Sequence, residues 1–118
     1  MQITLLKSKI HRATVTSSNL NYEGSIALGS DLISAAGLCI FEKVDIYNIN
    51  SGERISTYVI EGNNPGEVGI NGAAARKAQR GDLIIIASYV SCSKEEAKEH
   101  KPLLVFVNEK NQVKSISH

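Results

Sequence analysis

Short apolar runs, separated by turn residues, are the feature that most constrains how this chain can fold. In the clearest runs apolar and polar residues alternate, which is typical of strands that bury one face. The runs predicted to be strands are residues 3–10, 12–16, 26–28, 44–49, 54–60, 68–70, 83–90 and 103–107. Only brief helices are predicted between them, at residues 31–36 and 94–100 and in one turn after residue 73. We therefore expect a mainly β fold that closes, or nearly closes, into a barrel.

Two stretches are expected to lack regular structure. Residues 17–19 are small and polar (Ser-Ser-Asn) and are predicted to be a break between strands. The residues from Lys110 onward show no clear pattern and are predicted to be a loose tail.

The length and charge of the chain limit its class. Its 118 residues fit a single domain, and 13 basic against 12 acidic residues leave almost no net charge. We therefore expect no nucleic-acid partner. Residues 83–87, the longest apolar run, are too short to cross a bilayer, and residues 1–10 lack an apolar signal core. A cytoplasmic protein without membrane contact is expected. Cys39 and Cys92 form no metal-binding motif, so no metal is expected.

The pair Gly24-Ser25, within Tyr22-Glu23-Gly24-Ser25, is the first candidate for chemistry. A serine hydroxyl can attack the carbonyl of the residue before it, and a glycine there leaves that carbonyl unobstructed. The ordinary interpretation of the same pair is a turn, because glycine and serine are both common in turns.

Two further groups carry polar chemistry. Residues 54–58 (Arg-Ile-Ser-Thr-Tyr) place a guanidinium, hydroxyls and a phenol on one predicted strand. Residues 71–75 (Asn-Gly-Ala-Ala-Ala) expose backbone amides that can hold an anion or a carbonyl oxygen. Lys9 and His11 add two cationic or proton-handling groups. Each also has an ordinary interpretation: a solvated strand, a packed tyrosine, a helical turn or a structural histidine.

Taken in order, these groups resemble the aspartate 1-decarboxylase family, pyruvoyl-dependent carbon–carbon lyases. The family converts L-aspartate to β-alanine and CO₂ for pantothenate and coenzyme A synthesis. The resemblance runs from about Met1 to Val107. The matching segments are residues 9–13, 20–25, 35–37, 54–58, 71–75 and 81–87.

The resemblance implies a fold, an assembly and a maturation step. The fold is a six-stranded double-psi β-barrel, and the assembly is a homotetramer with active sites between neighbouring subunits. The precursor cuts itself between Gly24 and Ser25, giving a β chain of residues 1–24 and an α chain of residues 25–118. Thr57 stabilises the oxyanion on Gly24 during this step. Ser25 becomes a covalent pyruvoyl group, the cofactor, which binds the substrate amine as a Schiff base.

The resemblance also implies roles around the substrate. Arg54 binds the carboxylate that the substrate keeps, and Lys9 shares that charge, with His11 lining the same pocket. Tyr58 returns a proton after CO₂ leaves. The remaining implied residues hold the carbonyl side of the adduct or form the pocket wall: Asn71, Gly72, Ala73, Ala74 and Ala75 for the first, Tyr22 and Tyr47 for the second.

The sequence departs from the family pattern in three places. Tyr47 stands where the family commonly has tryptophan, Arg76-Lys77 is more basic than the pattern, and the tail after Asn108 matches little. Two alternatives remain: a small β-barrel that binds a ligand or partner and is never processed, and a conventional nucleophile in which His11 serves Ser25 as base. The sequence leaves open whether a maturation factor is needed and how strictly aspartate is preferred over glutamate.

Overall fold

The computed structural model describes all residues, Met1–His118, and the chain is mainly β, as predicted. Two short α-helices, α1 (Ser30–Ala36) and α2 (Lys94–Ala97), and one 3₁₀ turn, η1 (Gly72–Arg76), accompany the strands. The strands are β1 (Gln2–Thr14), β2 (Ser17–Asn19), β3 (Ser25–Leu28), β4 (Lys43–Asn48), β5 (Arg54–Glu61), β6 (Val68–Asn71), β7 (Leu83–Ser93), β8 (Leu103–Val107) and β9 (Val113–Ser117).

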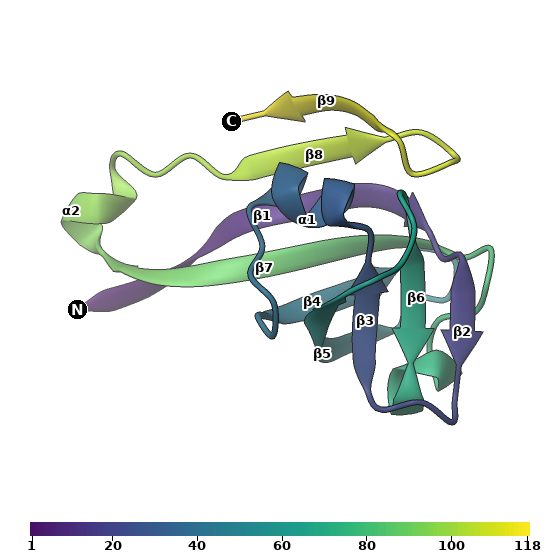
Figure 1. Cartoon of the computed structure of the whole chain (residues 1–118). Helices are drawn as coiled ribbons and strands as arrows, with labels where there is room; N and C mark the ends of the chain where they lie inside the picture. The colour runs from purple at the N-terminus through teal and green to yellow at the C-terminus, as the bar shows by residue number, and fades with distance from the viewer.

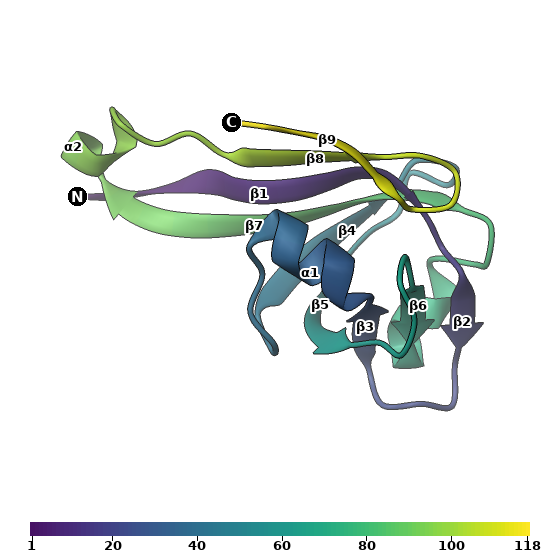
Figure 2. The same cartoon turned by 45° about the horizontal axis from the view of Figure 1, so that its top comes forward.

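The nine strands form one hydrogen-bonded sheet in the order β2-β6-β3-β5-β4-β7-β1-β8-β9. The long strands β1 and β7 lie side by side with the shorter β8 next to β1, and β2, β3 and β6 run across their direction at one end (Figures 1 and 2). The residues that join β1 to β2 bring the sheet back on itself. Thr16 N donates to Val68 O over 2.8 Å, and Val15 N donates to Asp82 O over 2.9 Å. The segment between β1 and β2 thus contacts both β6 and the start of β7.

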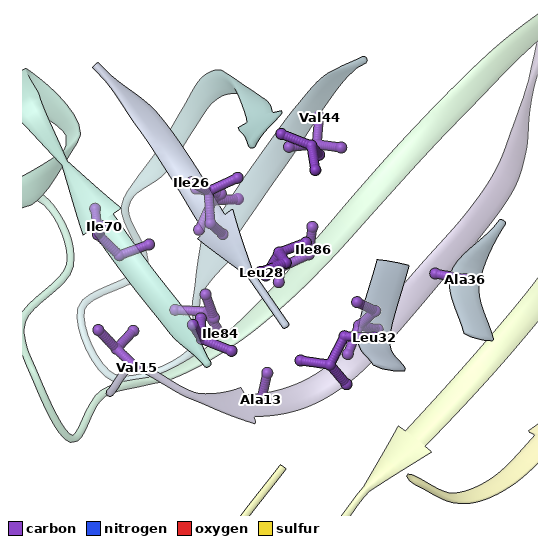
Figure 3. Packing of buried hydrophobic residues seen from close by; sticks show 14 of the residues in the cluster. Ala13, Val15, Ile26, Leu28, Leu32, Ala36, Val44, Ile70, Ile84 and Ile86 are labelled. Atoms are coloured by element: carbon purple, nitrogen blue, oxygen red, sulfur yellow. The ribbon is translucent and has the colours of Figure 1, made fainter. Parts of the chain in front are cut away.

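Isoleucines from neighbouring strands build the core. Ile10, Ile86 and Ile46 are paired in register across β1, β7 and β4, and all three are fully buried. Figure 3 shows Ile86 among other buried residues of the core, such as Ile84 and Leu28, with Leu32 of α1 packed against them. Burial of each such side chain stabilises the fold by about 1.5–3 kcal/mol. Because side chains alternate along a strand, the residues directly before and after each of these isoleucines point to the outer face of the sheet.

The prediction of a break at residues 17–19 was wrong. These residues form β2, which pairs in parallel with β6, matching Ser17 with Gly69 and Asn19 with Asn71. The partner lies about fifty residues away in the sequence, so local composition gives no sign of it.

The prediction of a loose tail after Lys110 was also wrong. Residues 113–117 form β9 against β8. The side chain of Asn111, only 1% exposed, anchors the turn before it. Its Nδ2 donates to Thr14 O and Gly66 O, and its Oδ1 accepts from Thr14 N, each over 2.8 Å.

The helices follow the sequence signals with small differences. Gly37 ends α1 in the left-handed conformation, and the cap at the other end is Gly29, without a side-chain hydrogen bond. Ser93 and Glu96 form a capping box at the start of α2. That helix ends at Ala97 rather than at His100, whose ring instead lies 2.6 Å from Leu6 O. The structure contains no helix long and apolar enough to span a membrane.

Candidate active site

Ser25, the first residue of β3, is fixed between two neighbouring segments. It is 1% exposed and pairs in the sheet with Asn71, the last residue of β6. Its Oγ donates to Glu23 O over 3.1 Å and accepts a hydrogen bond from Asn71 Nδ2 over 3.1 Å. The hydroxyl is therefore held beside the short segment of backbone that precedes it.

Gly72 packs directly against that segment. A β-carbon added to Gly72 would lie 2.6 Å from Gly24 Cα and 2.7 Å from Gly24 N. Gly72 also has a φ of +71°, which favours glycine independently of space. Both facts require glycine at the start of η1.

Gly24 is different, because nothing in the structure requires glycine there. An added β-carbon would meet nothing within 4 Å, and Gly24 is not among the glycines with a positive φ. A glycine that neither packing nor backbone strain explains is consistent with the chemical reason, an unobstructed carbonyl.

The register of β3 and β5 relates Thr57 and Tyr58 to Gly24 and Ser25. The two strands are parallel, with Ile26 opposite Val59. Extended back by one residue, this register matches Ser25 with Tyr58, and extended back by two it matches Gly24 with Thr57; the Thr57 and Tyr58 side chains point to opposite faces of β5. Both side chains are half-buried, and the Tyr58 ring lies 6.1 Å from the ring of Phe41.

The alanines of η1 complete this group. Ala73 is exposed, whereas Ala74 packs against the hydrophobic core and Ala75, 5% exposed, belongs to it. The group that one chain assembles, hereafter the serine cluster, is Gly24, Ser25, Thr57, Tyr58, Asn71, Gly72, Ala73, Ala74 and Ala75. Tyr22 and Asn71 also line a cavity of about 530 Å³ beside β2 and β6.

The other predicted residues lie on the outer face of β1, β4 and β5, and we call them the cationic group: Lys9, His11, Tyr47 and Arg54. Arg54 is opposite Tyr47 in the sheet, and its guanidinium carbon lies 4.0 Å above the Tyr47 ring centre. This distance is typical of a cation–π contact.

His11 is half-buried, with its ring edge-on to Phe106 at 5.7 Å. Its Nδ1 is buried and has no hydrogen-bond partner. Burial, followed by the positive charges of Lys9 and Arg12, lowers the pKa of His11 below its ordinary value. Both effects favour the neutral form of the imidazole.

The two groups do not meet within one chain. Arg54 is four residues before Tyr58 on β5, about 13 Å at the usual rise of a strand. Lys9 and His11 are on β1, which β4 and β7 separate from β5. One chain thus brings together the serine cluster, and it keeps the cationic group apart.

Sequence reasoning missed Tyr89 and Asp45, which lie around Tyr47, and included Ser56 only within the group of residues 54–58. The Tyr47 and Tyr89 hydroxyls lie 2.6 Å apart, and Ser56 Oγ donates to Asp45 Oδ1 over 2.6 Å. The hydrogen bond to Tyr47, then burial, raises the pKa of Tyr89 to about 12. The sequence contained part of this information. Asp45 is two residues from Tyr47 and Ser56 is two residues from Arg54, so each pair is expected on one face of its strand.

The contacts of Ser25 argue against a conventional serine nucleophile. Its Oγ is bonded to a carbonyl and an amide, neither of which is a base, and His11 lies on a distant strand. No three His, Cys, Asp or Glu side chains gather as they would around a metal ion. The fold and the site define a small β protein built around a buried serine that follows an unconstrained glycine.

Comparison with known proteins identifies the family. The profile of the family described as Aspartate decarboxylase matches residues 1–114. An aspartate 1-decarboxylase of Bdellovibrio bacteriovorus is 60% identical over 113 residues, covering 96% of this chain and 90% of the relative. Relatives with the same description from Hydrogenobaculum sp. and Cupriavidus necator are 55% and 50% identical, over 96% and 98% of this chain and 90% and 98% of their own. This chain belongs to the aspartate decarboxylase family, which confirms the resemblance found in the sequence.

Proposed function

We propose that the protein decarboxylates L-aspartate to β-alanine and CO₂ and so supplies pantothenate synthesis in the cytoplasm. The observation that carries this proposal is the match to relatives described as aspartate 1-decarboxylases over nearly the whole chain. The same match favours an enzyme over a small barrel that only binds a ligand or partner.

Maturation begins with attack of Ser25 Oγ on the Gly24 carbonyl carbon. The Gly24–Ser25 C–N bond breaks, an ester forms, and Thr57 donates to the transient oxyanion. Elimination across Cα–Cβ of Ser25 then releases residues 1–24 as a carboxylate and leaves dehydroalanine. Hydrolysis expels ammonia and leaves the pyruvoyl group on residues 25–118. The buried, doubly hydrogen-bonded Ser25 Oγ and the open space around Gly24 support this step.

The residues around Ser25 could hold a pyruvoyl group at that position. Asn71 Nδ2 already donates to the Ser25 side chain and remains available to a carbonyl oxygen at that position. Gly72 and the small side chains of Ala73, Ala74 and Ala75 leave room for their backbone amides to approach it. The pyruvoyl group supplies a carbonyl that binds the substrate amine and accepts the electron pair left when CO₂ departs.

The remaining residues bind and orient the substrate. Arg54 holds the retained carboxylate, because its planar fork matches two oxygens and its guanidinium is already stacked on Tyr47. Lys9 shares that charge, and neutral His11 lines the pocket without competing for the anion. Tyr58, next to Ser25 in the register, returns the proton to the carbon that lost CO₂. Tyr22 and Tyr47 wall the pocket.

We further propose that the site is completed between subunits of a homotetramer. The position of Lys9 and His11 on β1, three strands from β5 in the order of the sheet, supports this. The six-stranded double-psi barrel is the finer fold that we propose, with β1 and β2 counted as one strand and β8 and β9 as additions. The hydrogen bonds that join residues 15–16 to Val68 and Asp82 support such closure.

The direct test is β-alanine formation from L-aspartate by the purified protein. We expect the wild type to release β-alanine and CO₂ in equal amounts, and Ser25→Ala to release neither. Since Ser25 is buried and an alanine fits its space, the variant should stay folded. A wild type that yields no β-alanine, or a Ser25→Ala variant as active as the wild type, would contradict the proposal.

A further inference from the structure

The outer face of β4 and β5 carries a small hollow next to Arg54. Its volume is about 280 Å³, and it is lined by Asp45, Tyr47, Arg54, Ile55 and Ser56. Arg54 is exposed, and its guanidinium has no carboxylate partner among the ion pairs of the chain. The contact that restrains it within the chain is the Tyr47 ring, 4.0 Å away. The position of that ring therefore sets the direction in which the guanidinium points.

A chain of polar groups fixes the ring in turn. Tyr47 Oη lies 2.6 Å from Tyr89 Oη and donates a longer hydrogen bond, of 3.5 Å, to Asp45 Oδ2. When Tyr47 donates to Asp45, Tyr89 must be the donor to Tyr47, because each phenol has one proton. Ser56 Oγ holds the other oxygen of Asp45 over 2.6 Å. Four side chains from β7, β4 and β5 thus form one continuous network.

We propose that Tyr89 is a positioning residue whose hydroxyl fixes the Tyr47 ring beneath Arg54, so that the guanidinium is preorganised for a carboxylate. This inference rests on the proposed function, in which Arg54 binds the carboxylate that aspartate keeps. A ring held by its hydroxyl loses its freedom before the ligand arrives, which lowers the cost of binding. The raised pKa of Tyr89, about 12, keeps its proton available as a donor throughout the physiological range.

The test uses succinate, a dicarboxylate without an amine, as a ligand that does not react. Its dissociation constant is measured by calorimetry for the wild type, Tyr89→Phe, Tyr47→Phe and the double variant. We expect Tyr89→Phe to weaken succinate binding and to raise KM for aspartate by about three- to ten-fold, the range of one hydrogen bond. The value of kcat should change less than about two-fold, because the hydroxyl does not touch the reacting atoms.

The double variant separates positioning from a general loss of structure. If Tyr89 acts through Tyr47, adding Tyr89→Phe to Tyr47→Phe should not weaken succinate binding any further. Ser91→Ala is the matched control, since it removes an exposed hydroxyl from the same face of β7 that is bonded only to Gln2. This control should bind succinate like the wild type, and thermal melting checks that all variants are folded.

Three outcomes would overturn the inference. The first is unchanged succinate binding in Tyr89→Phe, and the second is that Tyr89→Phe weakens succinate binding as much in the Tyr47→Phe variant as in the wild type. The third is that the wild type does not bind succinate. Failure of the proposed reaction gives a different result. In that case the wild type binds succinate with the predicted pattern among the variants but forms no β-alanine, and the role of Tyr89 stands.

Discussion

Two glycines at the centre of the site are glycine for different reasons. Gly72 has a positive φ and no room for a β-carbon, so the backbone alone demands it. Gly24 has room and no positive φ, so its identity points to reactivity at its carbonyl. The sequence suggested a role for both, but only the structure separates a packing requirement from a chemical one.

The contact between Gly72 and Gly24 predicts a processing defect. In Gly72→Ala the new methyl group would lie 2.6 Å from Gly24 Cα, so the segment before Ser25 must move. We expect self-cleavage to slow by at least about ten-fold, as expected for a displaced reacting group. Denaturing electrophoresis measures the uncleaved fraction over time.

Gly52→Ala is the matched control for backbone strain. Gly52 has a φ of +80°, and an added β-carbon there meets nothing within 4 Å. This variant should lose stability, by about 1 kcal/mol, and still cleave at the wild-type rate. Equal cleavage rates in Gly72→Ala and the wild type would remove the proposed role of this contact.

Asp82 is expected to make the stability of the fold depend on pH. Hydrogen bonds from Gln79 N and from Asn48 Nδ2 lower the pKa of Asp82 below its ordinary value of 3.8. A carboxylate whose pKa is lower in the folded state stabilises the fold above pH 3.8, and this stabilisation is lost as the pH falls through the lower value.

We therefore expect Asp82→Asn to cost about 1 kcal/mol at pH 7 and to flatten the loss of stability in acid. Urea unfolding at pH 7, 4 and 3 measures both effects. Glu109→Gln, at an exposed site without a hydrogen-bonded carboxylate, is the control. A variant whose stability falls with pH as steeply as the wild type would show that Asp82 is not the responsible group.

At the scale of elements, the alternation of apolar and polar residues predicted most strands. The two strands that were not predicted, β2 and β9, lack this alternation. The strands with an alternating apolar face, such as β4 and β5, were predicted within one residue of their ends. By contrast, β2 has three small polar residues and exists through its pairing with β6. All five residues of β9 are exposed, so no apolar alternation marks it.

Besides the pairing of β8 with β1, the side chain of Asn111 joins the turn between β8 and β9 to Thr14 and Gly66. Asn111→Ala removes three hydrogen bonds and leaves Thr14 N, Thr14 O and Gly66 O without a partner. We expect a loss of about 2–4 kcal/mol, because buried polar groups are left unsatisfied. Chemical denaturation measures this loss, and Lys114→Ala, on the exposed face of β9, should stay within about 0.5 kcal/mol of the wild type. Similar stability of the two variants would contradict the anchoring role.

At the scale of the whole molecule, the sequence predicted a set of site residues but not their division into two groups. Spacing along β5 suggested that Arg54 and Tyr58 act together, yet Arg54 lies over Tyr47 while Tyr58 lies beside Ser25. Such a division depends on the curvature of the sheet and on assembly, which no local pattern encodes.

If the site is completed between subunits, two different inactive variants should restore activity when they are mixed in one tetramer. Ser25→Ala and Arg54→Ala chains should each be inactive alone. Mixed tetramers should regain activity, because some sites then combine an intact Ser25 with an intact Arg54 from the neighbour. With random mixing about a quarter of the sites are complete.

The control pairs Ser25→Ala with Tyr58→Phe. Both residues belong to the serine cluster of one chain, so no mixed site is complete and no activity should return. Restoration in the control, or none with Arg54→Ala, would contradict a site built from the serine cluster of one subunit and the cationic group of another. Turnover of L-aspartate by co-expressed, co-purified chains is the measurement.

The account depends most on the conversion of Ser25 into a keto group by cleavage of its own chain, and intact mass spectrometry of the active protein tests it directly. We predict two species, a fragment of residues 1–24 and a fragment of residues 25–118 whose first residue carries a keto oxygen in place of the serine amine and a methyl group in place of the hydroxymethyl group. Treatment with hydroxylamine should shift the mass of the larger fragment alone. A single chain of 118 residues with an unmodified serine, in a preparation that turns over aspartate at its full rate, would contradict the account.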